Sequence, residues 1–105
     1  MRPMNFNQSV YAMTSLIPMG KVTTYGAIAK AIGSPRAARA VGQALGANPN
    51  PVVVPCHRVV RSDGSLGGYS GGEGPLTKAK LLAREGVPVT AGKVKLGSYL
   101  FADFQ

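Results

Sequence analysis

A small-residue turn, Gly33-Ser34, between two short segments with helical patterns is the feature that most constrains the fold. The segment before it, 25–32, carries its two isoleucines on one face. The segment after it, 35–46, begins with Pro35 behind Ser34, a favoured N-cap followed by a residue whose missing N–H costs nothing at the first helical position. Two short helices joined by such a turn predict a helix-turn-helix.

The expected helix over 35–46 has two unlike faces. At about 100° per residue, one face is apolar and should pack on the preceding helix; its members are Ala38, Val41 and Leu45. The other face carries two cations, a small residue and an amide: Arg36, Arg39, Ala40 and Gln43. These side chains suit close contact with phosphates and bases. An ordinary solvated face is the alternative.

Helical spacing also predicts a first and a last helix. The first follows Asn5 as N-cap, ends at Pro18 and Gly20, and has an apolar face made of Phe6, Val10, Met13 and Ile17. The last, over 75–85, should be followed by Gly86 as its C′ residue. We expect it to point Lys78 outward and to bury Leu76, Ala79 and Leu82.

Short apolar segments predict small β elements. Val52–Val54 is long enough for a short buried strand. Val59-Val60 and Ser65-Leu66 are expected to pair across a turn as a hairpin. The segments 87–89 and 94–96 should form a further β element on either side of the turn at Ala91-Gly92. The fold class expected from these patterns is α+β, mainly helical with small β elements.

The charge of the chain favours a polyanionic partner. The 105 residues, enough for one domain, carry a net charge of +8, and everything before Asp63 is basic or neutral. A positive field of this kind attracts nucleic acid, although basic ribosomal and membrane-surface proteins share the sign.

Cysteine and hydropathy patterns exclude several classes of protein. A lone cysteine excludes an internal disulfide, and one Cys with one His cannot complete a four-ligand zinc site. No apolar run is long enough to span a bilayer, and the N-terminus lacks the apolar core of a signal peptide. We therefore expect a cytoplasmic protein with no metal and no membrane partner.

The only cysteine and the only histidine are adjacent, Cys56-His57, between Pro55 and Arg58. A thiol at the end of an apolar strand, behind a rigid proline and beside an ionisable imidazole, is a candidate nucleophile. A buried structural cysteine beside an exposed histidine is the alternative, and composition alone favours it.

The segment Pro55-Cys56-His57-Arg58-Val59 resembles the active-site signature of the 6-O-alkylguanine-DNA alkyltransferases, also called methylated-DNA–protein-cysteine methyltransferases. Other segments match in the family's order and at its spacings: Gly20 to Gly26, Arg36 to Gly42, Asn48-Pro49 and Gly67 to Gly72. The resemblance covers roughly residues 6–86. It implies a winged helix-turn-helix fold, double-stranded DNA containing alkylated guanine as partner, and one domain over 1–105 without the N-terminal domain that members commonly carry. We expect a monomer that needs no cofactor.

The resemblance implies catalytic roles for matching residues. Cys56 accepts the alkyl group, and His57 and Glu85 complete its proton relay. Tyr25 helps to rotate the nucleotide out of the duplex and donates a proton to the guanine. Asn48 braces the loop below the site as a structural hinge.

The resemblance also implies DNA contacts and a base pocket. Arg39 intrudes into the base stack where the target nucleotide leaves, on a helix that enters the minor groove. The DNA-binding set is completed by Thr24, Arg36, Ala40 and Gln43. The substrate pocket is lined by Val59, Tyr69, Ser70 and Gly71.

Physical chemistry connects these roles. A base inside a duplex cannot present its 6-oxygen substituent to a thiol, so the nucleotide must be flipped out. Neighbouring side chains of an extended segment point to opposite faces, so we expect a water between Cys56 and His57, with Glu85 on the other imidazole nitrogen. The thioether product has no good leaving group, which predicts one turnover per molecule.

Three other functions stay open at this point. The first is a non-catalytic alkyltransferase-like protein that only binds the lesion, against which the presence of Cys56 argues. The second is a helix-turn-helix regulator with an incidental Cys-His pair. The third is a cysteine hydrolase, which would turn over and would not need the basic first half of the chain.

Overall fold

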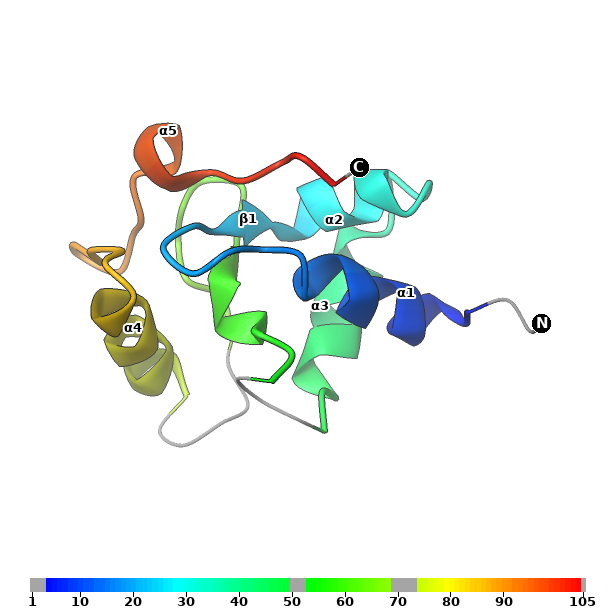
Figure 1. Cartoon of the computed structure of the whole chain (residues 1–105), viewed down its shortest axis with the longest axis horizontal. Helices are drawn as coiled ribbons and strands as arrows, with labels where there is room; N and C mark the ends of the chain where they lie inside the picture. Colours follow the sequence, from blue (N-terminus) through cyan, green and yellow to red (C-terminus); the bar gives the residue numbers. More distant parts are fainter. Residues whose placement is uncertain (1–3, 50–52, 69–73, 105) are drawn as a thin grey trace.

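The computed structural model describes residues 4–49, 53–68 and 74–104, which form a mainly helical fold around one pair of short strands (Figure 1). The expected fold class is confirmed. The elements in chain order are α1 (Phe6–Thr14), β1 (Thr23–Thr24), α2 (Tyr25–Ala31), α3 (Ala38–Gly46), the 3-10 turn η1 (Cys56–Arg58), β2 (Val59–Val60), α4 (Pro75–Arg84) and α5 (Leu96–Tyr99).

Helix α1 begins as the sequence predicts. The side chain of Asn5 accepts a hydrogen bond from the backbone N–H of Gln8, and the side chain of Gln8 accepts one from the N–H of Asn5. This capping box satisfies two of the N–H groups that a helix start leaves free. The helix buries Val10, and the following turn buries Ile17.

Helices α2 and α3 form the predicted helix-turn-helix. Thr24 caps α2, since its hydroxyl accepts a hydrogen bond from the N–H of Ala27 at 3.0 Å. After α2 the chain turns at Gly33, whose φ is +82°, and the N–H of Ser34 donates to the carbonyl of Ala29. This pattern closes a helix with a left-handed residue, which glycine adopts without a steric penalty.

The predicted start of α3 at Pro35, with Ser34 as N-cap, is wrong. The carbonyl of Ser34 accepts a hydrogen bond from the N–H of Ala37, so residues 35–36 lie in a turn and α3 begins at Ala38. The cap residue Ala37 has no side-chain hydrogen bond. Arg36 therefore precedes the helix and is not part of its face.

Strand β2 pairs with β1 and not with its expected hairpin partner. The pairing is parallel, with Thr23 opposite Val59 and Thr24 opposite Val60. The turn after β2 does close, because the N–H of Arg61 donates to the carbonyl of Ser65, but Ser65 forms its bridge with Lys93. The hairpin prediction missed these partners because they lie far away in the sequence.

The expected strand over Val52–Val54 is not formed in its described part. Val53 is 80% exposed, and the carbonyl of Val54 accepts hydrogen bonds from the N–H of Cys56 and from the side chain of Asn48. These two bonds bend the chain into η1. Val52 lies outside the described residues.

Two apolar cores lie on the two sides of the strand pair. Helices α1, α2 and α3 enclose the first core, which includes Cys56 and Val59. Val60 and Leu82 belong to the second, between the strands, α4 and the C-terminal segment (Figure 1). Because successive residues of a strand point to opposite faces, Val59 and Val60 each supply one core.

Helix α4 ends near the predicted place and turns a different face inward. Gly86 follows its C-cap, as expected, and Leu82 is fully buried. Leu76, however, is 52% exposed, whereas Lys78 is fully buried. Lys78 lies one helical turn before Leu82, on the same face, so both side chains enter the interior.

The C-terminal segment crosses back over the strand pair (Figure 1). Thr90 and Lys93 form an antiparallel bridge across the turn at Ala91-Gly92. The segments 87–89 and 94–96, expected to form the β element, are not strands, and Leu96 begins the unpredicted helix α5. The N–H of Phe101 then donates to the carbonyl of Val22, while the N–H of Val22 donates to the carbonyl of Tyr99. This segment thereby covers the start of β1.

Gly64→Ala should destabilise the fold through a backbone clash. Gly64 has a φ of +87°, and an added Cβ would lie 2.5 Å from the carbonyl oxygen of Val94. We expect the free energy of unfolding, measured by urea denaturation, to fall by at least about 2 kcal/mol. Gly33→Ala is the matched control, because its φ is +82° and an added Cβ meets nothing within 4 Å, so only backbone strain remains. Equal losses in the two variants would contradict the clash.

Candidate active site

The segment that carries Cys56 and His57 is a tight turn and not an extended strand. The N–H of Cys56 donates to the carbonyl of Val54 at 2.7 Å, and the N–H of Arg58 donates to that of Pro55 at 2.9 Å. Both Cys56 and His57 are buried, so the expectation of an extended segment and the alternative of an exposed histidine are both wrong.

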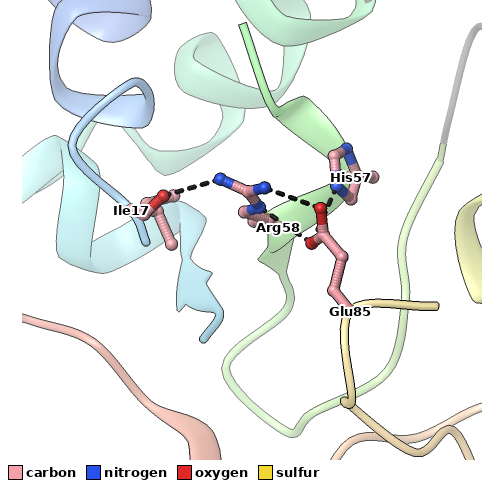
Figure 2. A network of polar contacts seen from close by, with 4 residues as sticks. All are labelled: Ile17, His57, Arg58 and Glu85. Atoms are coloured by element: carbon pink, nitrogen blue, oxygen red, sulfur yellow. Dashed lines mark hydrogen bonds and ion pairs between the residues drawn. The ribbon is translucent and has the colours of Figure 1, made fainter. Parts of the chain in front are cut away.

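A buried ion-pair network fixes His57. Its Nε2 lies 3.1 Å from Oε1 of Glu85, the residue that the resemblance implies as its partner (Figure 2). Arg58 donates to both oxygens of the same carboxylate, from Nε at 2.8 Å and from Nη2 at 2.6 Å. Its Nη1 donates to the carbonyl of Ile17 at 2.8 Å. The guanidinium thus ties η1 to the end of α4 and to the turn after α1.

The network sets the protonation of the imidazole. The hydrogen bonds from Arg58 hold the pKa of Glu85 below its usual range, so the carboxylate is ionised and can only accept. Nε2 of His57 must therefore carry the proton, and Nδ1 is left with a lone pair. Burial lowers the pKa of His57, against the opposing effect of Glu85, so the imidazole is neutral at pH 7.

Nδ1 of His57 is buried and has no hydrogen-bond partner among the described residues. The expected water between Cys56 and His57 stays a prediction, and the reason given for it, an extended segment, does not hold in a 3-10 turn. A buried basic nitrogen without a protein partner is available to take a proton.

Cys56 opens into a cleft of about 890 Å³ between α2, α3 and the segment after β2. Its lining includes Tyr25, Arg39 and Gln43 from the helix-turn-helix, together with Arg61 and Gly67 from the other side. Both arginines and Gln43 are exposed, so the entrance is basic and polar while the thiol is 5% exposed. An open cleft with a buried thiol suits a ligand that enters from outside.

Tyr25 forms one wall of the cleft in close contact with two glycines. A Cβ added at Gly67 would lie 2.8 Å from the Tyr25 hydroxyl, and one added at Gly42 would lie 3.8 Å from its ring. Burial raises the pKa of Tyr25, partly opposed by the charge of Arg61, so its hydroxyl is protonated at neutral pH.

The remaining predicted residues divide into three groups. Asn48 is buried and donates from Nδ2 to the carbonyl of Val54 at 2.9 Å, in the loop before Cys56; its role as a structural hinge stays a prediction. Outside the cleft lining lie Thr24, Arg36, Ala40 and Val59. Outside the described residues lie Tyr69, Ser70 and Gly71.

Sequence reasoning missed several residues at the site. Arg58 stands within the recognised signature, but nothing in its local pattern indicates the distant Glu85. Arg61 and Ser62 line the cleft, although no sequence signal singled out either residue. The burial of Lys78 could have been predicted, because its spacing from Leu82 places both residues on the same face of the helix.

No group of three or more metal-binding side chains occurs in the described ranges. Among the helices of those ranges, none has the length and apolar character needed to cross a membrane.

The imidazole of His57 should titrate below the ordinary histidine pKa of 6.5. Because it is the only histidine, its ring resonances in an NMR titration report it without ambiguity. In Glu85→Gln we expect the midpoint to fall further, since the carboxylate raises the pKa of His57. Asp63→Asn makes the same chemical change at an exposed turn and should leave the midpoint unchanged. A midpoint insensitive to Glu85→Gln would contradict the network.

The chain is similar in sequence to several known proteins. The family model described as "6-O-methylguanine DNA methyltransferase, DNA binding domain" matches residues 5–87. The methylated-DNA–protein-cysteine methyltransferase of Rattus norvegicus is 42% identical over 102 residues, which cover 93% of this chain and 48% of the rat protein. The bifunctional transcriptional activator/DNA repair enzyme Ada of Escherichia coli is 48% identical over 80 residues, 76% of this chain and 22% of Ada. The chain thus spans about half or less of the length of these relatives.

Solved structures are similar in fold. The Mycobacterium tuberculosis OGT in complex with DNA matches with a TM-score of 0.75 and 47% identity, over 81% of this chain and 51% of that one. Schizosaccharomyces pombe (S. pombe) Atl1, in complex with damaged DNA containing O6-carboxymethylguanine, matches with a TM-score of 0.84 and 36% identity, over 96% and 98%. On the matched sequence, the fold and the position of the thiol, the chain belongs to the 6-O-methylguanine DNA methyltransferase family and contains its DNA-binding domain.

Proposed function

We propose that the chain repairs DNA by transferring an alkyl group from the 6-oxygen of an alkylated guanine to Cys56, once per molecule. The observation that carries the proposal is the placement of a buried thiol at the base of an open basic cleft, next to a histidine held by an ionised carboxylate. Relatives named as methylated-DNA–protein-cysteine methyltransferases support it.

In the proposed reaction the proton of the Cys56 thiol passes to Nδ1 of His57, through a bridging water. The nitrogen is available because Glu85 holds the other ring proton on Nε2. The thiolate attacks the alkyl carbon, the bond from that carbon to the 6-oxygen breaks, and its electron pair goes to the guanine. The imidazolium that forms is stabilised by the negative charge of Glu85.

Tyr25 is the proposed proton donor to the departing guanine. Its hydroxyl is protonated at neutral pH, it lines the same cleft as Cys56, and it is fixed by α2 on one side and Gly67 on the other. The product is a thioether, which has no ready leaving group. The enzyme is therefore consumed in the reaction.

The proposed partner is double-stranded DNA, and the proposed assembly is a monomer in the cytoplasm. Arg39 and Gln43 stand at the cleft entrance on α3, with Arg36 just before that helix, where cations can contact phosphates as a nucleotide rotates into the cleft. Thr24 and Ala40 lie on the same helix-turn-helix and complete the proposed DNA contacts. The family resemblance alone supports the proposed pocket residues, which are Val59, Tyr69, Ser70 and Gly71.

A lesion-binding protein without transfer is the second candidate. The match to Atl1 over nearly the whole of both chains favours it, because that protein is in complex with damaged DNA. The thiol of Cys56 in the cleft favours transfer.

Mass spectrometry of the intact protein separates the two candidates. After incubation with a duplex containing 6-O-methylguanine, we expect a gain of one methyl group at Cys56 and no further turnover. Cys56→Ala should gain no mass yet still bind the methylated duplex, because the cleft and the basic helix remain. An unmodified wild-type protein, or modification of another residue, would contradict the proposed transfer.

Arg39→Ala should slow repair of duplex DNA more than reaction with free 6-O-benzylguanine. The side chain stands at the entrance and would act while the nucleotide leaves the stack, a step that the free base does not need. Single-turnover rates with both substrates measure the difference. Arg84→Ala, at an exposed position on α4 outside the cleft, is the control and should change neither rate. Equal losses on both substrates in Arg39→Ala would remove its role in flipping.

A further inference from the structure

Lys78 is a fully buried cation whose hydrogen-bond partners among the described residues are all neutral. Within the described residues its Nζ contacts the carbonyl of Val59 at 2.6 Å, that of Leu66, that of Gly68 at 3.3 Å and the hydroxyl of Tyr25 at 3.4 Å. Burying a lysine without an acidic partner is costly, and it is tolerated where hydrogen bonds compensate for the lost water. Because the burial of Lys78 lowers the stability of the fold, we expect this side chain to have a functional role.

The ammonium has three N–H groups for these four acceptors. Two point to the carbonyls of Val59 and Leu66, so the third is shared between the carbonyl of Gly68 and the hydroxyl of Tyr25. Lys78 therefore joins β2 and the segment 66–68 to α2. Its Nζ also lies 5.7 Å from the centre of the Tyr25 ring.

This arrangement restricts the direction of the Tyr25 proton. An ammonium group can only donate, so toward Lys78 the phenol oxygen is an acceptor. The phenol's own hydrogen must then point elsewhere, and Tyr25 borders the cleft that holds Cys56. The positive charge also favours negative charge on the phenol oxygen as its proton leaves.

We propose that Lys78 is a positioning residue for the transfer, holding Tyr25 as a proton donor toward the cleft and stabilising its oxygen as the guanine departs. The proposal rests on the proposed function. In the step itself the phenol proton passes to the guanine as the carbon–oxygen bond breaks, while Lys78 keeps its three protons.

The charge of Lys78 is present at neutral pH. Burial lowers its pKa to about 8, which the negative charge of a Cys56 thiolate opposes and the charge of Arg61 reinforces. The ionisable groups near it are Tyr25 from α2, which it contacts, Cys56 and His57 from η1, and Arg61 from the turn after β2. Because the folded pKa lies near 8, the ammonium is lost as the pH rises through that value.

A double-mutant cycle of Lys78→Met and Tyr25→Phe tests the proposal. Single-turnover rates with free 6-O-benzylguanine exclude effects on DNA binding. We expect Lys78→Met to slow transfer by about 10- to 100-fold, in the range of general acid catalysis. Lys78→Met should add little to the loss in Tyr25→Phe, because its effect passes through the phenol. Lys80→Met, the same change at an exposed position of α4, should leave the rate unchanged. Losses that multiply would overturn the proposal.

A pH profile tests the same point without altering Lys78, in case Lys78→Met does not fold. The wild-type rate should decline above about pH 8, as Lys78 loses its charge, and this decline should be absent in Tyr25→Phe. A decline that persists in Tyr25→Phe, or no decline in the wild type, would overturn the proposal.

The failure of this inference can be distinguished from the failure of the proposed function. If the wild type transfers no alkyl group at all, both fail. If the wild type transfers normally but the losses in the double-mutant cycle multiply, only this inference fails.

Discussion

The pairing of Arg58 with Glu85 is the interaction on which the site depends. A bidentate guanidinium–carboxylate pair has a fixed planar geometry, and here both side chains are largely buried. The pair fixes the end of α4 against η1, and the third nitrogen of Arg58 holds the turn after α1 (Figure 2). Losing either partner would leave an unpaired charge in the interior, which is strongly unfavourable.

The same carboxylate links the fold to the chemistry. Glu85 accepts from Arg58 and from His57, so the bond that stabilises the tertiary structure also decides which imidazole nitrogen carries the proton. The tautomer follows from the ionised state of Glu85 and needs no adjustment when substrate arrives. Preorganisation of this kind avoids a cost at the moment of reaction.

Two largely buried cationic side chains hold different parts of the site. Arg58 fixes η1 through a carboxylate, while Lys78 fixes β2 and the segment 66–68 through carbonyl groups. Cys56 and Val59 belong to the first apolar core and Val60 to the second, so the strand pair lies at the boundary of the two cores. Arg58 holds η1, and Lys78 contacts the carbonyls of Leu66 and Gly68, so both side chains fix backbone in or next to the cleft lining.

The sequence by itself determined the elements whose signals are local. The cap at Asn5, the turn at Gly33, the burial of Val41 and Leu45 on α3 and the choice of Cys56-His57 as the candidate site all follow from residue type and spacing, whereas Glu85 came from the family resemblance. Tertiary structure decided the remainder: the partner of β2, the curl of η1, the role of Arg58 and the burial of Lys78. Each of these depends on contacts between residues far apart in the chain, whose energies no local pattern contains. A lysine in particular is expected in water, and only the carbonyl groups gathered around it by the fold make its burial possible.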